Sequence, residues 1–392
     1  MTTTINNEHK KLNVPNSTDK GNVIRNVPHL RFPEFEGEWE KTKFGDIATG
    51  FDYGMNAAAK NYDGLNKYIR ITDIDEASST YTDKDIVSPD GVLTDNYLVN
   101  NRDILLARTG ASTGKSYLYK KSDGKLYYAG FLIRANVTTH DPYFVFSQLH
   151  THRYWRWVSI MSARSGQPGI NSQEYSSFPI YTTSIEEESK IAKLLSLLDE
   201  RIATQNKIID KLQSLIKGIA QKIVHSNKTN VRLSECVECS SSTLQESDVC
   251  EHGAYPVYGA NGIVGYLDNY NTEGEAVYII KDGSGVGTVS YVTGKCSATG
   301  TLNTLQAKEG YSLQYLYYLL KVFNFEPYKT GMAIPHIYFK DYGKSKVFCP
   351  SYTEQLRYAR LLSAIDSKLS VEKNLLTSLS MQKQYLLRQM FI

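Results

Sequence analysis

The chain contains an internal repeat, and this repeat constrains the possible fold more than any other feature. Residues 191–199 (IAKLLSLLD) match residues 358–366 (YARLLSAID) at an offset of 167 residues. The offset holds without a gap from Ser176 to the end of the sequence, and upstream it drifts by a few residues, as insertions in loops would cause. We therefore expect two copies of one unit, each made of a globular part followed by a long helix.

Each copy ends in a heptad pattern, in which apolar residues recur at alternating steps of four and three. Both patterns open with a capping box, Ser184 with Glu187 and Ser351 with Glu354. Each helix of about 40 residues would be roughly 60 Å long, and its single apolar stripe needs a partner. We expect the two helices to pair in a coiled coil, in a direction that the pattern leaves open. The seam positions are Ile191, Leu195, Leu198, Ile202, Gln205, Ile209 and Leu212 in the first helix and Tyr358, Leu362, Ile365, Leu369, Glu372, Leu376 and Leu379 in the second.

One polar residue interrupts the seam at the same place in both copies. Gln205 corresponds to Glu372, and Lys383 is a further polar seam position. Because buried polar groups in coiled coils often fix the register of the helices, we predict this role for these three residues.

The segments before the helices are typical of α+β domains. Short runs of β-forming residues, bounded by Gly and Asp, precede a helical pattern in each copy. The expected organisation is a disordered tail over 1–28, a first domain over 29–183, a central helix over 184–226, a second domain over 227–350 and a C-terminal helix over 351–392. With 392 residues, of which 41% are hydrophobic, the chain is long enough to bury separate cores.

Composition limits the class of protein. Lys and Arg number 44 against 41 Asp and Glu, which excludes a polycationic protein. There is no stretch of 18 apolar residues and no apolar core of a signal peptide, so we expect no membrane association. Five cysteines without the spacing of a disulfide framework indicate a reducing compartment, and we expect a cytoplasmic protein.

Charge is polarised in the same order in both copies. Residues 51–100 hold 4 basic and 9 acidic side chains, and residues 101–170 hold 10 basic and 3 acidic. In the second copy, residues 232–280 hold 1 basic and 8 acidic side chains, and residues 281–345 hold 7 basic and 4 acidic. Solvated charge without a partner would explain one such pattern, but its recurrence favours a basic face that binds an anion.

Two local patterns suggest other chemistry. Residues 110–116 (GASTGKS) are close to a phosphate-binding loop, but three residues rather than four separate the glycines, so a tight turn that presents its backbone to a phosphate is preferred. The group Cys236, Cys239, Cys250 and His252 leaves a zinc site open, with buried free thiols as the alternative, because the spacing is irregular and the first copy has no Cys. We expect no metal and no catalytic residue in this chain.

Taken in order, the motifs of the chain resemble those of the specificity subunits of type I restriction-modification systems. Residues 28–35 (PHLRFPEF) resemble the opening of such subunits. Residues 102–110 (RDILLARTG) resemble the strand and glycine turn of a target-recognition domain, and residues 331–337 (GMAIPHI) resemble the segment that closes one. Pro350 and the heptads after it resemble the helical region of the family. The resemblance extends over nearly the whole chain after residue 28.

The resemblance implies an α+β fold in which two similar target-recognition domains are joined by two long antiparallel coiled-coil helices, with a pseudo-twofold internal repeat. It implies a non-catalytic subunit that binds double-stranded DNA and reads one half of a bipartite target with each domain. Its helices would dock two methyltransferase subunits, which use S-adenosylmethionine to methylate adenine at N6. Two restriction subunits would add cleavage that depends on ATP and Mg. The chain itself would hold no cofactor.

Individual DNA contacts are expected among basic and amide side chains, because Arg reads guanine, Asn and Gln read adenine, and Lys mostly meets phosphate. For any one of them, a plain surface charge is the alternative. The candidates are Arg108, Thr109, Lys115, Arg134, Arg153, Arg156, Arg164, Gln167 and Asn171 in the first copy and Lys281, Ser284, Lys295, Lys329, Thr330, His336 and Lys340 in the second.

A different class of function remains open on sequence grounds. The chain could be a coiled-coil scaffold or adaptor with two peptide-binding domains and no nucleic acid. Salt-sensitive binding to duplex DNA would distinguish the two, because release of counterions gives a steep salt dependence.

Overall fold

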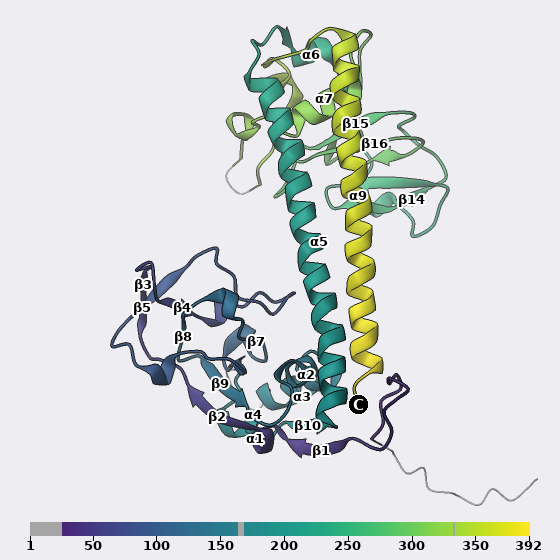
Figure 1. Ribbon diagram of the computed structural model, residues 1–392. Helices are drawn as coiled ribbons and strands as arrows, with labels where there is room; N and C mark the ends of the chain where they lie inside the picture. Colours follow the sequence, from purple (N-terminus) through teal and green to yellow (C-terminus); the bar gives the residue numbers. More distant parts are fainter. Residues whose placement is uncertain (1–25, 164–167, 332–333) are drawn as a thin grey trace, which may run out of the picture. The chain divides into compact units, whose positions relative to one another are not determined.

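The computed structural model describes residues 26–163, 168–331 and 334–392. The chain forms two compact units: unit 1 consists of Met1–Asp199 and Met381–Ile392, and unit 2 of Glu200–Ser380. Each unit contains one α+β domain and parts of both long helices (Figure 1). Most of the tail that we expect to be disordered lies outside the described residues.

The domain of unit 1 is built on a four-stranded antiparallel sheet in the order β2-β9-β6-β7. The strands of this sheet are β2 (Ala48–Tyr53), β9 (Leu132–Val137), β6 (Asp103–Ala107) and β7 (Ser116–Leu118). Three smaller pairs are β1 (Glu40–Lys43) with β10 (Pro179–Thr182), β3 (Ala58–Asn61) with β5 (Val87–Asp90), and β4 (Lys67–Ile69) with β8 (Leu126–Tyr128). The helices are α1 (Phe44–Ile47), α2 (Pro142–Gln148), α3 (His152–Ser162) and α4 (Ser172–Ser176).

The domain of unit 2 repeats this plan with the sheet order β12-β18-β15-β16. Its strands are β12 (Val237–Ser241), β18 (Leu302–Ala307), β15 (Ala276–Ile280) and β16 (Val289–Val292). A second sheet joins β14 (Gly262–Leu267), β13 (Tyr255–Gly259) and β17 (Ser297–Ala298), and β11 (Val231–Arg232) pairs with β19 (Lys346–Val347). The helices are α6 (Leu233–Cys236), α7 (Leu313–Leu320) and α8 (Phe339–Tyr342).

The central strand of each main sheet is buried on both faces. In β6, Ile104 and Leu106 pack into one hydrophobic cluster, whereas Leu105 and Ala107 pack into another. The strand β15 likewise divides alternate residues between two clusters. Because successive side chains of a strand point to opposite faces, a continuous apolar run is what such a strand requires. The runs ILLA and AVYII of the repeat therefore form corresponding strands.

The two long helices are α5 (Ile185–His225) and α9 (Tyr352–Gln389). In unit 2 they lie side by side (Figure 1), and Asn230, just after α5, bonds to Cys349, just before α9. Gln205 lies as many residues before the last residue of α5 as Glu372 lies after the first residue of α9, and the two side chains contact each other. The helices are therefore antiparallel, as the family resemblance implies.

The contact between Gln205 and Glu372 also defines the symmetry of the repeat. The side-chain amide of Gln205 donates to the backbone oxygen of Glu372 at 3.0 Å and to its carboxylate. The two residues occupy the same position in the two copies, 167 residues apart. Equivalent residues meet each other at a twofold axis, so a pseudo-twofold axis passes close to this pair.

The heptad seam is covered throughout. All of the predicted seam residues are buried or half-buried, with Ile191, Leu195 and Leu362 each only 1% exposed. The cap of α5 is formed by a hydrogen bond from the Glu187 N–H to the Ser184 hydroxyl. At the start of α9, the Ser351 N–H donates to the Glu354 carboxylate.

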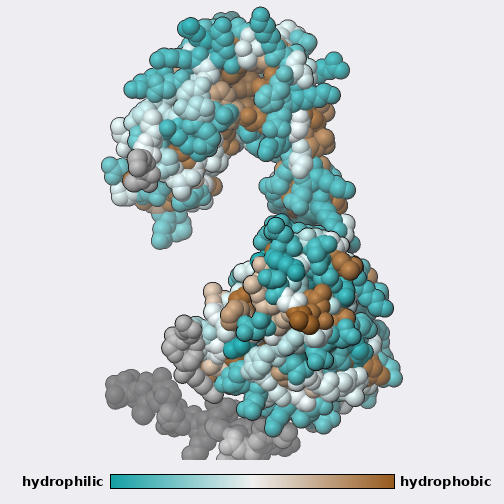
Figure 2. Space-filling view, turned by 90° about the vertical axis from the view of Figure 1, so that its left-hand side faces the viewer, coloured by the Kyte–Doolittle hydropathy of each residue, from teal (hydrophilic) through white to brown (hydrophobic). Residues whose placement is uncertain are grey.

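The surface is mainly hydrophilic on the face that Figure 2 shows, with hydrophobic residues gathered in small patches on each unit. Among the described residues, no helix combines the length and the hydropathy needed to cross a bilayer.

Candidate nucleic-acid interface

In the first domain, the glycine turn after β6 is joined to the segment that precedes α4. The Gly110 N–H donates to the Pro168 carbonyl at 3.0 Å, and the Ile170 N–H donates to the Arg108 carbonyl at 2.9 Å. Between these bonds, Thr109 and Gly169 form a β-bridge. Two sequence motifs that lie about 60 residues apart thus form one loop cluster, which we call the clasp of the first domain.

The second domain has the same clasp. The Gly283 N–H donates to the Pro335 carbonyl at 2.9 Å, and the Ile337 N–H donates to the Lys281 carbonyl at 2.9 Å. A second pair of backbone bonds joins Thr330 to His336, and we call the described residues of this closing segment, Thr330, Gly331 and 334–336, the closing hairpin. The same hydrogen bonds therefore hold the same two motifs together in both copies.

Glycine is required in the turn for its backbone conformation. Gly110 has φ +65° and Gly283 has φ +96°, a region that residues with a Cβ rarely adopt. Gly114 has φ +91° and a Cβ there would lie 2.7 Å from Val158. The Gly114 carbonyl accepts a hydrogen bond from the Tyr154 hydroxyl at 2.8 Å, and this bond fixes the far end of the turn.

The turn does not have the context of a nucleotide-binding loop. A phosphate-binding loop joins a strand to a helix, whose N-terminus faces the phosphates. Here the turn joins β6 to β7, which pair with each other as antiparallel neighbours.

The cysteine motif is dispersed. The thiol of Cys236 lies 3.8 Å from that of Cys349, which is not part of the motif. Cys236 is buried, whereas Cys250 is exposed. In the part of the chain that the structure describes, no group of three or more His, Cys, Asp and Glu side chains is arranged to hold a metal ion.

Several residues of the first domain meet at the clasp. The guanidinium of Arg108 lies 4.8 Å from the centre of the Tyr53 ring and donates to the Gly130 carbonyl at 3.3 Å. The Tyr53 hydroxyl accepts a hydrogen bond from the Ser172 N–H at 3.3 Å. Asn171, the residue before Ser172, caps α4 through its side chain. Tyr53 therefore links Arg108 to the helix that follows the closing segment, and it was not among the residues predicted from the sequence.

The other candidates of the first domain lie in different surroundings. Lys115 pairs with Glu76 at 3.2 Å, and Arg134 pairs with Asp52 at 3.3 Å. Arg156 is exposed on α3. Arg164 and Gln167 lie outside the described residues.

The Arg153 side chain makes its hydrogen bonds inside the domain. Its guanidinium donates to the Pro179 carbonyl at 2.8 Å and to the Gln148 side chain at 3.1 Å. It also lies against the rings of Phe178 and Tyr181. Burial lowers the pKa of Arg153, as expected for a cation that has left water.

In the second domain, Lys281 and Ser284 lie on the glycine turn and Thr330 and His336 on the closing hairpin. The remaining candidates are engaged elsewhere. Lys340 lies 5.0 Å from the Tyr338 ring, Lys329 pairs with Glu326 at 2.6 Å, and Lys295 pairs with Glu273 at 3.7 Å.

Each clasp carries an exposed apolar side chain that the sequence did not single out. Phe131, whose carbonyl accepts from the Arg108 N–H at 3.0 Å, is 58% exposed. Ile334, in the closing hairpin of the second domain, is 67% exposed. An apolar group beside a cation can contact a thymine methyl or an unstacked base step.

Two α+β domains with matching clasps, each followed by a long helix, define a protein built from two copies of one unit. The model of a family described as the type I restriction modification DNA specificity domain matches residues 36–214 and again residues 225–381. The chain therefore belongs to this family and contains two copies of its domain.

Individual relatives agree with this assignment. The type I restriction enzyme MjaVIII specificity subunit of Methanocaldococcus jannaschii is 26% identical over 244 residues, which cover 57% of this chain and 54% of that protein. Matches to curated relatives span from 28% to 61% of the relatives' own lengths.

Solved structures share the fold. The crystal structure of the type I restriction-modification system S subunit from M. genitalium has a TM-score of 0.68 at 18% identity, covering 93% of this chain and 99% of that chain. A structure described as the basis of complex assembly and conformational transition of the type I R-M system has a TM-score of 0.50 at 15% identity, covering 90% of this chain and 97% of that chain.

Proposed function

We propose that this chain is the DNA-specificity subunit of a type I restriction-modification complex, and that each domain reads one half of a bipartite duplex target. The observation that carries the proposal is the recurrence of the same clasp, with the same backbone hydrogen bonds, in both domains. Membership of a DNA-specificity family supports the choice of ligand.

The clasps offer the groups that DNA reading needs. In the first, Tyr53 supports the planar guanidinium of Arg108, which suits bidentate contact with guanine in the major groove. In the second, Lys281 is a compact charge suited to a phosphate, and His336 adds a side chain that can hydrogen-bond a base edge or a phosphate. The two half-sites would therefore differ in sequence.

The paired helices would set the gap between the half-sites. Two readers on one face of B-DNA sit about 34 Å apart, or one helical turn. Helices of roughly 60 Å can span that distance and leave surface for partners. A stiff coiled coil implies an unread spacer of fixed length.

Methyltransferase partners would bind the outward surface of the helices. Lys193, Glu200, Arg201, Lys207 and Lys211 are all exposed on α5. We propose that two methyltransferase subunits and two restriction subunits assemble with this chain. S-adenosylmethionine, ATP and Mg would be held by those subunits, and the isolated chain would have no turnover.

The test is to co-express the chain with a type I methyltransferase subunit from the same genome and to map methylated adenines across the host genome. The expected result is a two-part motif with one fixed gap. A continuous short motif, or no methylation with a methyltransferase that binds the chain, would contradict the proposal.

Binding of the complex to duplex DNA separates this function from an adaptor that binds peptides. Affinity should fall steeply with salt concentration, by several powers of ten between about 50 and 200 mM if six to ten phosphates are contacted. An affinity for DNA that is absent or independent of salt would favour the adaptor.

A further inference from the structure

The two copies place an aspartate at the same point of their long helices. Asp199 of α5 corresponds to Asp366 of α9 at the offset of 167 residues. Each faces the helix that follows the main sheet of its own domain, α2 in unit 1 and α7 in unit 2. The two carboxylates nevertheless have different partners.

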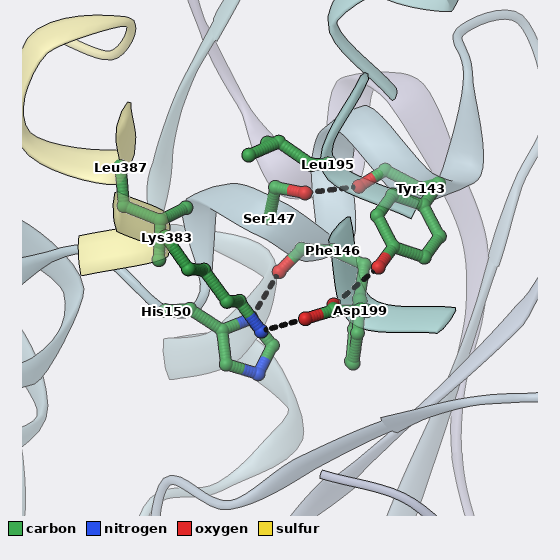
Figure 3. Close-up of a pocket in the computed structure, with 8 residues that line it drawn as sticks. All are labelled: Tyr143, Phe146, Ser147, His150, Leu195, Asp199, Lys383 and Leu387. Carbon is green, nitrogen blue, oxygen red and sulfur yellow. Dashed lines mark hydrogen bonds and ion pairs between the residues drawn. The ribbon is translucent and has the colours of Figure 1, made fainter. Parts of the chain in front are cut away.

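In unit 1, a cation from the chain itself neutralises the aspartate (Figure 3). The ammonium group of Lys383 lies 2.6 Å from Oδ1 of Asp199, and the Tyr143 hydroxyl donates to Oδ2 at 2.5 Å. Leu195 and Leu387 help to enclose the site, which leaves only about 10 Å³ of free space. There is no room for a further side chain.

In unit 2, the repeat does not supply this cation. The position that corresponds to Lys383 is Ile216, which is 4% exposed and packs in the core. Among the described residues, no basic nitrogen lies within 4.0 Å of the Asp366 carboxylate, which accepts one long hydrogen bond, from the Tyr318 hydroxyl at 3.4 Å. Asp366 is half-buried, so its charge is only partly solvated.

Beside Asp366 there is an open cleft of about 280 Å³ between α7 and α9. Tyr291, Tyr317 and Tyr318 form an aromatic wall, with ring centroids 5.5 Å apart for the first two and 4.8 Å apart for the last two. Ser367 and Ser370 are exposed at the rim. Because Tyr317 and Tyr318 are themselves buried, the charged group that the cleft offers is the Asp366 carboxylate, which suits an ammonium or guanidinium group.

The aromatic wall already attracts a cation at its edge. The ammonium group of Lys321 lies 5.0 Å from the centre of the Tyr317 ring and 3.1 Å from its hydroxyl. Its nitrogen lies more than 4.0 Å from the Asp366 carboxylate, so Lys321 does not form an ion pair with Asp366.

We propose that this cleft receives a Lys or Arg side chain of the methyltransferase subunit that docks on the second half of the chain. The side chain would form an ion pair with Asp366, as Lys383 does with Asp199. The inference rests on the proposed function and goes beyond it, because it makes the two docking positions different: one aspartate is neutralised internally and the other by a partner.

The first test measures methyltransferase binding to the full chain carrying Asp366→Asn, with Asp366→Glu as the matched control. Loss of a charged hydrogen bond should weaken the binding of one of the two methyltransferase subunits by about tenfold or more. The glutamate variant should recover much of this affinity. Thermal unfolding of the free chain should change little, because the hydrogen bond that Asp366 accepts from Tyr318 is long, at 3.4 Å.

The outcomes are distinguishable. If the wild-type chain binds no methyltransferase, the proposed function fails and this inference fails with it. If the wild-type chain binds and Asp366→Asn binds equally tightly, the inference alone is wrong.

The second test identifies the occupant. A benzophenone amino acid in place of Ser370 should cross-link, in the assembled complex, to a methyltransferase peptide that contains Lys or Arg. Adducts only within this chain or with a second copy of it would overturn the proposal, as would the absence of any methyltransferase adduct.

Discussion

The two domains share a backbone plan but join their long helices through different chemistry. In unit 1 the junction is ionic: Arg31 donates two hydrogen bonds of 2.7 Å to the Glu187 carboxylate, and His140 contacts Glu188 at 2.8 Å. In unit 2 the equivalent of Glu188 is Gln355, a neutral side chain that accepts from the Ser312 N–H at 2.9 Å. The two units therefore share backbone geometry, whereas the polar residues at the junction differ between them.

In both junctions, a side chain of the long helix accepts a hydrogen bond from the N–H of an N-cap residue. The Glu188 carboxylate accepts from the Asp141 N–H at 3.0 Å, at the cap of α2, and Gln355 accepts at the cap of α7. A carboxylate and an amide both supply an oxygen acceptor, so either satisfies this buried donor. The ionic version adds a dependence on pH and on its partner cation that the neutral version lacks.

The largest expected effect is at the ionic junction. Glu187→Ala would leave the guanidinium of Arg31, which is 11% exposed, without its partner, and should destabilise unit 1 by about 3 kcal/mol or more. The matched variant Glu354→Ala removes an exposed carboxylate at the corresponding position and should cost less than about 1 kcal/mol. Chemical denaturation measures both, and equal losses would show that the junctions are energetically alike.

The clasps should differ in DNA specificity. Arg108→Ala in the assembled complex should weaken DNA binding by about 1–3 kcal/mol and relax the sequence preference of one half-site. Lys281→Ala should weaken binding nearly uniformly across sequences and reduce the salt slope by about one. Competition binding with substituted duplexes measures both effects. A loss of selectivity confined to the Lys281 variant would reverse the assigned roles.

The pH dependence of stability should come from unit 1. The hydrogen bond to Glu188 raises the pKa of His140 above its usual value of 6.5. The protonated pair therefore stabilises the fold fully below about pH 6.5, and this contribution is lost as pH rises through the raised pKa.

Glu188→Gln, which copies the junction of unit 2, should flatten this dependence. Thermal unfolding between pH 5.5 and 8.5 would show it as a smaller fall in melting temperature. An unchanged pH profile would mean that His140 is not the responsible group.

The smallest expected change in stability is at the pseudo-twofold axis. Replacing Gln205 and Glu372 together by Leu exchanges a hydrogen-bonded polar pair for apolar packing, and these contributions largely offset each other, so the melting temperature should change little. Register, however, should become less uniform, because the polar pair is satisfied in only one alignment. Cysteine cross-linking across the seam should then trap several pairings, whereas a single pairing would remove the register role.

Much of the fold could be predicted from periodicity and the repeat. The heptad residues, the caps at Ser184 and Ser351 and the glycine turns follow local rules that act within a few residues. Those rules also predicted that Gln205 and Glu372 are buried polar seam positions, which their 5% and 7% exposure confirms.

The site was less accessible to sequence reasoning, because it depends on contacts between distant segments. Arginine is a residue type that often contacts DNA. The guanidinium of Arg153, however, packs against the rings of Phe178 and Tyr181 within the domain. Tyr53 is one of 29 tyrosines, and only strand pairing shows that it supports Arg108. A residue type predicts what a side chain can bind, but its neighbours decide whether it is free to do so.

The proposal that the paired helices set the gap in the DNA target is tested most directly by lengthening them. One heptad inserted at equivalent points of α5 and α9 adds about 10 Å of helix, which corresponds to about three base pairs. Mapping methylated adenines in cells that carry the lengthened chain should show the same two half-sites separated by about three more base pairs. An unchanged gap, with both half-sites still methylated, would contradict the role of the helices as a spacer.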